Sequence, residues 1–150
     1  MLSDRILFID AEAIVLDKPA GLPVDLPRAI ASSSSTKWVR THLAHLGLAD
    51  AFEPHIYSGR EHVERGKPAP DLYLYAAQKL GVDIGDTLII EDSRVGATGA
   101  LASGARVIGL AAGAHCLDGH ADMLRAVGVR DIAHDFNEVA RLIGLDQPSR

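Results

Sequence analysis

The sequence predicts an α/β domain, a Rossmann-like parallel sheet with helices on both faces. Three observations predict it. Short apolar runs alternate with segments of helical spacing from residue 28 onward. The Thr-Leu-Ile-Ile run at residues 87–90 has the unbroken apolar character of a strand buried on both faces. Glycines such as Gly81 and Gly104 close the helical segments, and strands that alternate with helices favour parallel pairing.

The elements follow one another in a regular order. The first strand is expected at residues 6–9, and a second apolar run occupies residues 13–16. Prolines and glycine then break the chain before an apolar stub at residues 28–31. Apolar spacing, caps and breakers predict the other elements: a helix from residue 36 to Gly47, a strand at 55–57, a helix at 71–80, a strand at 87–90, a helix at 97–103, a strand at 106–110, and helices at 121–127 and 136–143 with residues 131–133 between them.

Length and composition are typical of one globular domain. The chain has 150 residues, of which 47% are hydrophobic and 23% charged, enough for one hydrophobic core. The net charge of −5 argues against nucleic acid as a partner, and no window approaches the ~20 apolar residues of a membrane span. The single cysteine excludes an internal disulfide and fits a reducing cytoplasm. We therefore expect a cytoplasmic protein that binds neither nucleic acid nor membrane, with its oligomeric state open.

Three polar clusters fall at or near strand ends, at residues 32–35, 66–71 and 91–93. In an open parallel sheet, ligands bind at the carboxyl ends of the strands. A hydroxyl and backbone N–H groups at a helix start can hold phosphate oxygens. A lysine can offset charge on a transferring phosphoryl group, and carboxylates can hold Mg2+. The clusters therefore supply the groups that phosphoryl transfer needs.

The same clusters carry a resemblance to a known family. Residues 66–73 read Gly-Lys-Pro-Ala-Pro-Asp-Leu-Tyr, residues 89–96 read Ile-Ile-Glu-Asp-Ser-Arg-Val-Gly, and residues 102–105 read Ala-Ser-Gly-Ala. In spacing and order these strings resemble the beta-phosphoglucomutase-like branch of the haloacid dehalogenase superfamily. The resemblance covers residues 28–150 and implies a haloacid-dehalogenase-like core. It also implies a Mg2+-dependent phosphohydrolase, a phosphomonoester phosphatase or phosphomutase-like enzyme, whose partner is a small phosphorylated metabolite.

The resemblance assigns roles to residues of the three clusters. Ser32, with Ser33 beside it, resembles the phosphate-binding position. Lys67 resembles the lysine that steadies the nucleophile and the phosphate. Asp92 resembles the metal-binding aspartate, and Glu91 the neighbour that ligates or supports the ion. Singly these residues also fit a helix cap, turn filler or a solvated lysine, but their occurrence together favours the site.

The expected nucleophile comes from the first strand. The family places an aspartate at the end of that strand and a second aspartate two positions later, as general acid and base. Asp10 takes the first position, as nucleophile and metal ligand, and Glu12 the second. Glu12 is one methylene longer than the usual aspartate, and Ala13 stands where a glycine or threonine is usual. The span from Asp10 to Ser32 leaves no room for the helical cap domain of many relatives.

A second resemblance competes for the same segment. Residues 5–24, with Lys-Pro-Ala-Gly at 18–21, resemble the opening of the RluA-type pseudouridine synthases. The catalytic His-Arg-Leu-Asp motif of that family is absent from the chain, so synthase activity is not expected. We expect residues 1–27 to form a hairpin-like segment, followed by the core at 28–150; if the synthase resemblance is real, the chain is a fusion or rearranged product. If so, the alternative to an enzyme is a catalytically impaired remnant that binds metal, phosphate or a partner.

A further set of metal-type side chains lies in a loop-like stretch, at His115, Cys116 and His120. Structural zinc sites usually combine two pairs of ligands. No second pair follows here, so a metal site is not expected at this place.

Overall fold

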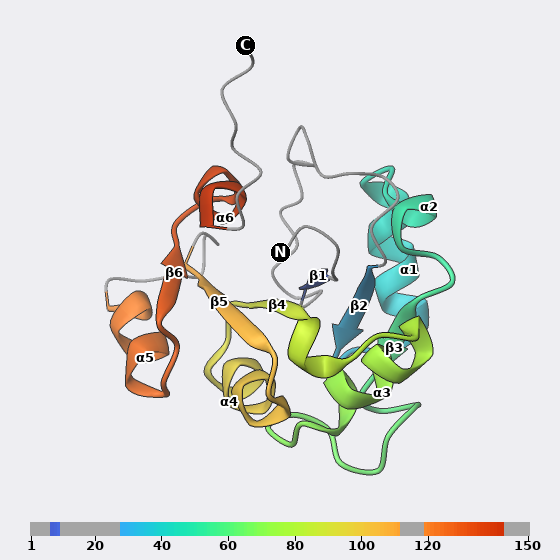
Figure 1. Cartoon of the computed structure of the whole chain (residues 1–150). Helices are drawn as coiled ribbons and strands as arrows, with labels where there is room; N and C mark the ends of the chain where they lie inside the picture. Colours follow the sequence, from blue (N-terminus) through green and yellow to red (C-terminus); the bar gives the residue numbers. More distant parts are fainter. Residues whose placement is uncertain (1–6, 10–27, 112–118, 143–150) are drawn as a thin grey trace.

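The structure is a computed structural model that describes residues 7–9, 28–111 and 119–142. In this part of the chain every element belongs to a single α/β core (Figure 1). The sheet is parallel and carries helices on both faces, which confirms the predicted fold class.

The described sheet has six strands in the order β3-β2-β1-β4-β5-β6, and each pair of neighbouring strands is parallel. The first strand of the described residues, β1, therefore lies in the middle. Its residue Phe8 is opposite Ala29 on one side and Ile89 on the other. The strands are β1 (Leu7–Ile9), β2 (Ala29–Ser32), β3 (Ile56–Ser58), β4 (Leu88–Glu91), β5 (Arg106–Leu110) and β6 (Asp131–Ala133).

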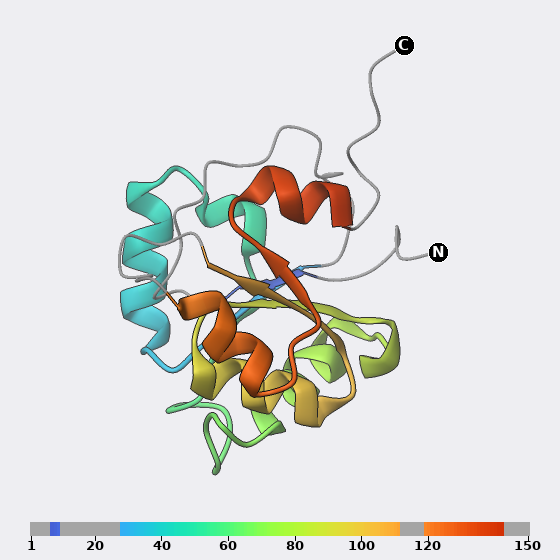
Figure 2. The same ribbon diagram turned by 90° about the vertical axis from the view of Figure 1, so that its left-hand side faces the viewer.

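Helices connect the strands and cover both faces of the sheet. Figure 2 shows α6 on one side of the sheet and α3, α4 and α5 on the other. None of the helices within the described ranges is long and apolar enough to cross a membrane. The helices are α1 (Thr36–His45), α2 (Ala49–Phe52), α3 (Asp71–Leu80), α4 (Arg94–Ser103), α5 (His120–Ala126) and α6 (Phe136–Leu142), with a 3-10 turn, η3, at Ile84–Asp86.

Alternate residues of strand β4 point into two separate hydrophobic cores. On β4, Ile89 packs in a cluster with buried residues of α3 and α4, such as Ala76 and Ala97. Its neighbours Leu88 and Ile90 belong to the opposite cluster, with α1 and α6. Side chains of a strand alternate between faces, so an apolar residue at every position requires helices on both sides.

Several predicted boundaries differ from the structure. Helix α4 begins at Arg94 rather than at residue 97, because Ser93 caps it by accepting a hydrogen bond from Gly96 N at 2.9 Å. Residues 131–133, which had no predicted state, form strand β6. The short helix α2 had no apolar periodicity long enough to predict it. The strand predicted at residues 13–16, the hairpin within residues 1–27 and the final residue of the last helix lie outside the described residues.

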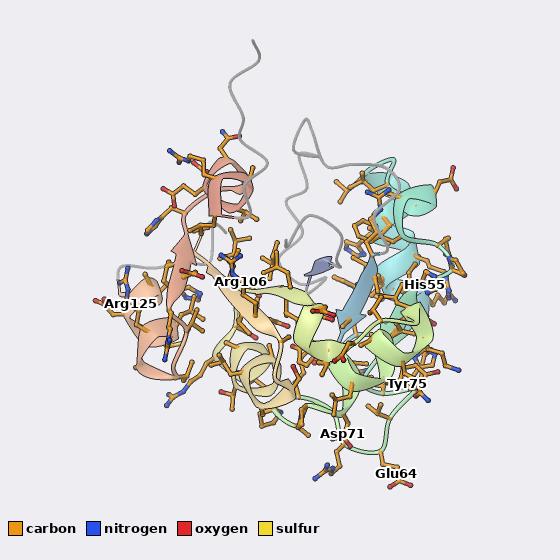
Figure 3. All side chains as sticks on the ribbon, in the orientation of Figure 1. His55, Glu64, Asp71, Tyr75, Arg106 and Arg125 are labelled. Carbon is orange, nitrogen blue, oxygen red and sulfur yellow. The ribbon has the colours of Figure 1, made fainter. Side chains whose placement is uncertain are left out.

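Two backbone donors of the edge strand β3 are satisfied within the chain. Ile56 N donates to Pro54 O at 3.1 Å, and Ser58 N donates to His62 Nδ1 at 2.8 Å. The His62 ring also stacks on Tyr75 of α3, with 5.4 Å between ring centroids (Tyr75 is labelled in Figure 3). Unpaired edge groups invite pairing with another chain, so these contacts protect the edge of the sheet.

At the other side of the sheet, one arginine links three elements. Arg106 of β5, labelled in Figure 3, donates to Asp131 Oδ2 at 3.3 Å and to the Leu142 carbonyl at 3.0 Å. The contacts join β5 to β6 and to the end of α6. These contacts stabilise the β6 side of the sheet, which is remote from the polar clusters.

Candidate functional site

The polar clusters meet at the carboxyl edge of the sheet. Strand β2 ends at Ser32 beside Ser58, the last residue of β3. Strand β4 ends at Glu91, and Asp92 follows it. The four side chains are buried, with exposures of 0%, 0%, 1% and 5% respectively. Buried polar groups need hydrogen-bond or charged partners. These side chains therefore form a polar site inside the protein rather than a part of the solvated surface.

Lys67 reaches this edge from the loop between β3 and α3. Its ammonium donates to Glu91 Oε1 at 2.7 Å and to the Ala31 carbonyl at 3.1 Å. Only 1% of each side chain of the Lys67–Glu91 pair is exposed. A buried ion pair is costly to desolvate and contributes little net stability, although breaking it is expensive. A buried ion pair is therefore better explained by a functional role than by a contribution to stability.

The turn after β2 presents hydroxyl and backbone groups. Ser32 Oγ accepts a hydrogen bond from Ser34 N at 3.0 Å, and the Ser32 carbonyl accepts one from Gly59 N at 2.8 Å. Ser35 caps α1 by accepting from Trp38 N at 3.2 Å. The turn therefore ends in a helix N-terminus, where backbone N–H groups favour anions.

The loop that carries Lys67 is fastened to the same helix. Glu61 accepts from Thr36 N at 2.9 Å and from Thr36 Oγ1 at 2.7 Å. These hydrogen bonds hold the pKa of the Glu61 carboxyl below its ordinary value. The contact connects the lysine loop to the start of α1, next to the serine turn.

Asp92 is held through its backbone by a residue from far along the chain. The Nε2–H of His120, at the start of α5, donates to the Asp92 carbonyl at 2.5 Å. The contact joins the end of β4 to α5. It leaves the Asp92 carboxylate, rather than its backbone, as the candidate metal ligand.

The donor set fits Mg2+ in chemistry and is incomplete in number. Glu91 and Asp92 offer carboxylate oxygens, the donors that Mg2+ prefers. Within residues 7–9, 28–111 and 119–142, no group of three His, Cys, Asp or Glu side chains could hold a metal ion. A third carboxylate would have to come from outside these ranges, as the assignment of Asp10 requires.

The structure brings together several predicted residues. Lys67 and Glu91 are in contact, and Ser32 and Asp92 are buried at the same edge of the sheet. Ser33 is exposed in the turn. Asp10 and Glu12 lie outside the described residues, although Asp10 directly follows Ile9, and Ile9 is opposite Ile90 of β4. The roles assigned to all these residues stay predictions.

Sequence reasoning missed four residues at this edge. Ser58, Glu61 and Tyr73 were not selected as site residues. His120 was considered only with His115 and Cys116, both outside the described residues, whereas the structure places it against the backbone of Asp92. A buried tyrosine two residues after Asp71 was a signal, because a buried hydroxyl needs a partner.

Comparison with known proteins identifies the family. A family model for haloacid dehalogenase-like hydrolases matches residues 12–104, more than half of the chain. The chain belongs to this family. The match includes the serine turn, the lysine loop and the end of β4, and it begins after Asp10.

Relatives of this haloacid dehalogenase-like chain include phosphatases. YhcW of Bacillus subtilis is 42% identical over 91 residues, which cover 61% of this chain and 39% of that protein. Hexitol phosphatase A of Escherichia coli is 37% identical over 83 residues, 55% of this chain and 37% of that protein. A hydrolase of this family from Deinococcus radiodurans, with bound phosphate and sodium, has a TM-score of 0.74 at 35% identity, covering 84% of this chain and 56% of that one. The chain spans less than half the length of these two curated relatives.

The second resemblance also has a counterpart. An RNA pseudouridine synthase of Zymomonas mobilis is 71% identical to this chain over 24 residues, which are 16% of this chain and 11% of that protein. The match is short and high in identity. It agrees with the predicted resemblance of a short segment to that class of enzyme.

Proposed function

We propose that this chain is a Mg2+-dependent phosphohydrolase of the haloacid dehalogenase type, acting on a small phosphorylated metabolite in the cytoplasm. One observation carries the proposal: the Lys67 ammonium is buried between Glu91 Oε1 and the Ala31 carbonyl, at the edge where Ser32 and Asp92 also lie. A buried lysine among carboxylates and a helix-start turn is the arrangement that phosphoryl transfer uses.

In the proposed site the phosphoryl group lies between the serine turn and the lysine. The Ser32 hydroxyl and the groups of Ser33 would bind phosphate oxygens. Lys67 would balance negative charge as it develops on the transferring group. The contacts of its ammonium with Glu91 and with the Ala31 carbonyl fix it before substrate arrives, so little reorganisation is needed in the transition state.

The metal would be held by Asp92, with Glu91 in support and Asp10 as a further ligand. When bound, Mg2+ would supply positive charge beside the phosphoryl oxygens. Glu91 Oε1 is already engaged by the Lys67 ammonium at 2.7 Å. Its support of the ion would therefore act through charge and through the position of Lys67 as much as through direct ligation.

The covalent chemistry is assigned to the first strand's end. An Asp10 carboxylate oxygen would form a bond to phosphorus while the bond to the substrate oxygen breaks, and Glu12 would give that leaving oxygen a proton. Water would then attack the aspartyl-phosphate and give a proton to Glu12, and the P–O bond to Asp10 would break to release orthophosphate. The reaction returns both acids to their starting state.

The N-terminal segment has a part in this proposal. We assign residues 1–27 a separate origin on the basis of the short synthase-like match, and residues 28–150 the core, although the family model already matches from residue 12. Strand β1 nevertheless lies between β2 and β4, where its end precedes Asp10. A segment of foreign origin could therefore supply the central strand of the core.

Two assays test the proposal. Metal-loaded wild type should hydrolyse an aryl phosphate such as p-nitrophenyl phosphate, and Asp10→Asn should abolish turnover with little change in melting temperature. Millimolar Mg2+ should raise the melting temperature of the wild type more than that of Asp92→Asn, because a ligand of the native state stabilises it. Activity that survives Asp10→Asn would remove that residue as nucleophile. An inactive wild type with an Asp92-dependent response to Mg2+ would favour a metal-binding remnant instead.

A further inference from the structure

Tyr73 extends from the first turns of α3 toward the candidate site. Its side chain is completely buried, and its ring packs in the core cluster with Leu72 and Ile89. Its hydroxyl donates to Glu91 Oε1, and the Gly96 carbonyl lies 3.0 Å from the same hydroxyl. Packing alone explains the ring, since a phenylalanine would fill the same volume, but it does not explain the hydroxyl.

One carboxylate oxygen thus accepts from two donors on different elements. Glu91 Oε1 binds the Lys67 ammonium from the loop and the Tyr73 hydroxyl from α3. A carboxylate oxygen has lone pairs for two donors, and hydrogen bonds to an ionised acceptor are the strong ones. Without the Tyr73 hydroxyl, Glu91 Oε1 would keep its hydrogen bond from Lys67 in the loop and would lose the one from α3.

The rest of the Glu91 carboxylate is held by close packing against α4. A Cβ built at Gly96 would lie 2.1 Å from Glu91 Oε2, so the carboxylate occupies the space that any side chain at this position would fill. Glu91 is therefore confined between the lysine loop, α3 and the first turn of α4. Rotation of its carboxylate would break the contacts with Lys67 and Tyr73 together.

The position of Lys67 in turn depends on Glu91. The ammonium has one contact to Glu91 Oε1 and another to the carbonyl of Ala31, the residue before Ser32. The ammonium also lies 5.3 Å from the centre of the Tyr73 ring, on which a cation is favoured. Tyr73 thus acts on the ammonium through its ring and, by way of Glu91, through its hydroxyl.

We propose that Tyr73 is a positioning residue: its hydroxyl fixes the Glu91 carboxylate and thereby places the Lys67 ammonium for phosphate. The inference rests on the proposed function for what the ammonium binds. The structural part of the inference is that the position of Lys67 depends on the Tyr73 hydroxyl. This part can be tested without any enzyme activity. A residue that is only part of the core would tolerate Tyr73→Phe with no change at Lys67.

The test compares Tyr73→Phe with Tyr57→Phe in the full-length, Mg2+-loaded protein. Tyr57 is a matched control, because it is also buried and its hydroxyl bonds a side chain, His55 Nδ1, at 2.7 Å. Three quantities are measured: the position of Lys67 Nζ in crystal structures, the affinity for orthophosphate by calorimetry, and kcat and KM for an aryl phosphate.

We expect Tyr73→Phe to displace the ammonium and to weaken orthophosphate binding by roughly tenfold, the scale of one hydrogen bond to a charged group. In an active enzyme kcat should fall by more than KM rises, because charge on the phosphoryl group is greatest in the transition state. Tyr57→Phe should leave the Lys67 ammonium in place, and it should change the orthophosphate affinity, kcat and KM by no more than twofold. Equal effects of the two variants, or an unmoved ammonium with unchanged affinity, would overturn the inference.

Failure of the proposed function is recognisable separately. If the wild type neither binds orthophosphate nor hydrolyses the aryl phosphate, the proposed function fails. The crystallographic position of Lys67 then decides alone: a displaced ammonium in Tyr73→Phe supports the positioning role, and an unmoved one overturns it.

Discussion

The ammonium of Lys67 and the carboxylate of Glu91 illustrate how much a single buried residue can determine. Both side chains are 1% exposed and lie 2.7 Å apart. Loss of one partner leaves the other charge buried and unpaired, which costs about 3–5 kcal/mol in comparable sites. A substitution at Lys67 should therefore affect stability as well as chemistry, and the two effects must be measured separately.

We predict that Lys67→Ala lowers turnover of an aryl phosphate by at least ~100-fold, the scale of losing one well-placed electrostatic group. The measurement is kcat at saturating substrate and at a temperature well below the melting point of the variant. Lys37→Ala, a change at an exposed lysine of α1, is the control and should leave kcat unchanged. Full turnover in folded Lys67→Ala would mean that the loop has only a structural role.

Glu61 offers a prediction about pH. Its hydrogen bonds with Thr36 hold its pKa below the ordinary 4.5, so Thr36→Val should raise that pKa by removing the hydroxyl donor. A depressed carboxyl pKa contributes stability above the unfolded-state pKa, and this contribution is lost as pH falls through the folded-state value. The wild type should therefore retain the loop contact to lower pH than the variant does.

An NMR titration of the side-chain carboxyl signals measures the effect. Glu138 serves as internal control, because its pKa is also lowered, by hydrogen bonds from His134 at a different place. Thr36→Val should move the Glu61 titration and leave that of Glu138 in place. Identical Glu61 curves in both proteins would contradict the contact.

The sequence predicted those candidate site residues that lie in short motifs of fixed spacing. Lys67, Glu91 and Asp92 lie in strings that combine unusual residue types at fixed spacing, and the structure places Lys67 and Glu91 in contact. Tyr73 and His120 reach the same edge through contacts that join distant parts of the chain. Such contacts depend on how helices pack, which residue spacing does not specify.

Among the elements, α4 depends most on what it packs against. A Cβ at Gly96 would approach the Glu91 carboxylate, and a Cβ at Gly99 would lie 2.9 Å from the carbonyl of Ala69 in the lysine loop. Two glycines on one helix thus allow it to contact both the Glu91 carboxylate and the loop that carries Lys67. The prediction of this helix from residue 97 missed its first turn, because a serine cap rather than apolar spacing begins it.

We predict that Gly96→Ala destabilises the fold, although alanine has the higher helix propensity. The added methyl group must displace the Glu91 carboxylate, and overpacking of this kind costs about 1–3 kcal/mol. Chemical denaturation monitored by circular dichroism gives the free energy of unfolding. Gly85→Ala is the control, since its Cβ would meet nothing closer than Asp83 Oδ1 at 3.6 Å. A Gly96→Ala protein as stable as the wild type would contradict the close packing.

For the whole molecule, the decisive feature is the place of β1. It pairs with β2 on one side and with β4 on the other, so it joins the strand that ends at Ser32 to the strand that ends at Glu91. The alternation of strands and helices predicted the parallel sheet. It could not predict that a short N-terminal run would occupy the centre, because periodicity carries no information on strand order.

We predict that Phe8→Pro destabilises the whole fold far more than Phe8→Ala. Proline removes a backbone donor from a strand with neighbours on both sides, and the unpaired acceptor costs about 1–3 kcal/mol before any distortion is counted. Phe8→Ala keeps the backbone donor and controls for the loss of the side chain. Thermal unfolding by circular dichroism compares the two, and equal melting temperatures would indicate that β1 is dispensable.

The central position of β1 also affects how the protein can fold while it is being synthesised on the ribosome. Leu7 is paired with Leu88, so a growing polypeptide carries the first strand long before its second partner has been synthesised. At typical elongation speeds the interval is roughly 4–16 seconds. During this time one side of β1 lacks its neighbour, and an open strand side can pair with other chains. Yield of folded protein should therefore improve when chaperones are more abundant during synthesis, independently of how stable the finished molecule is.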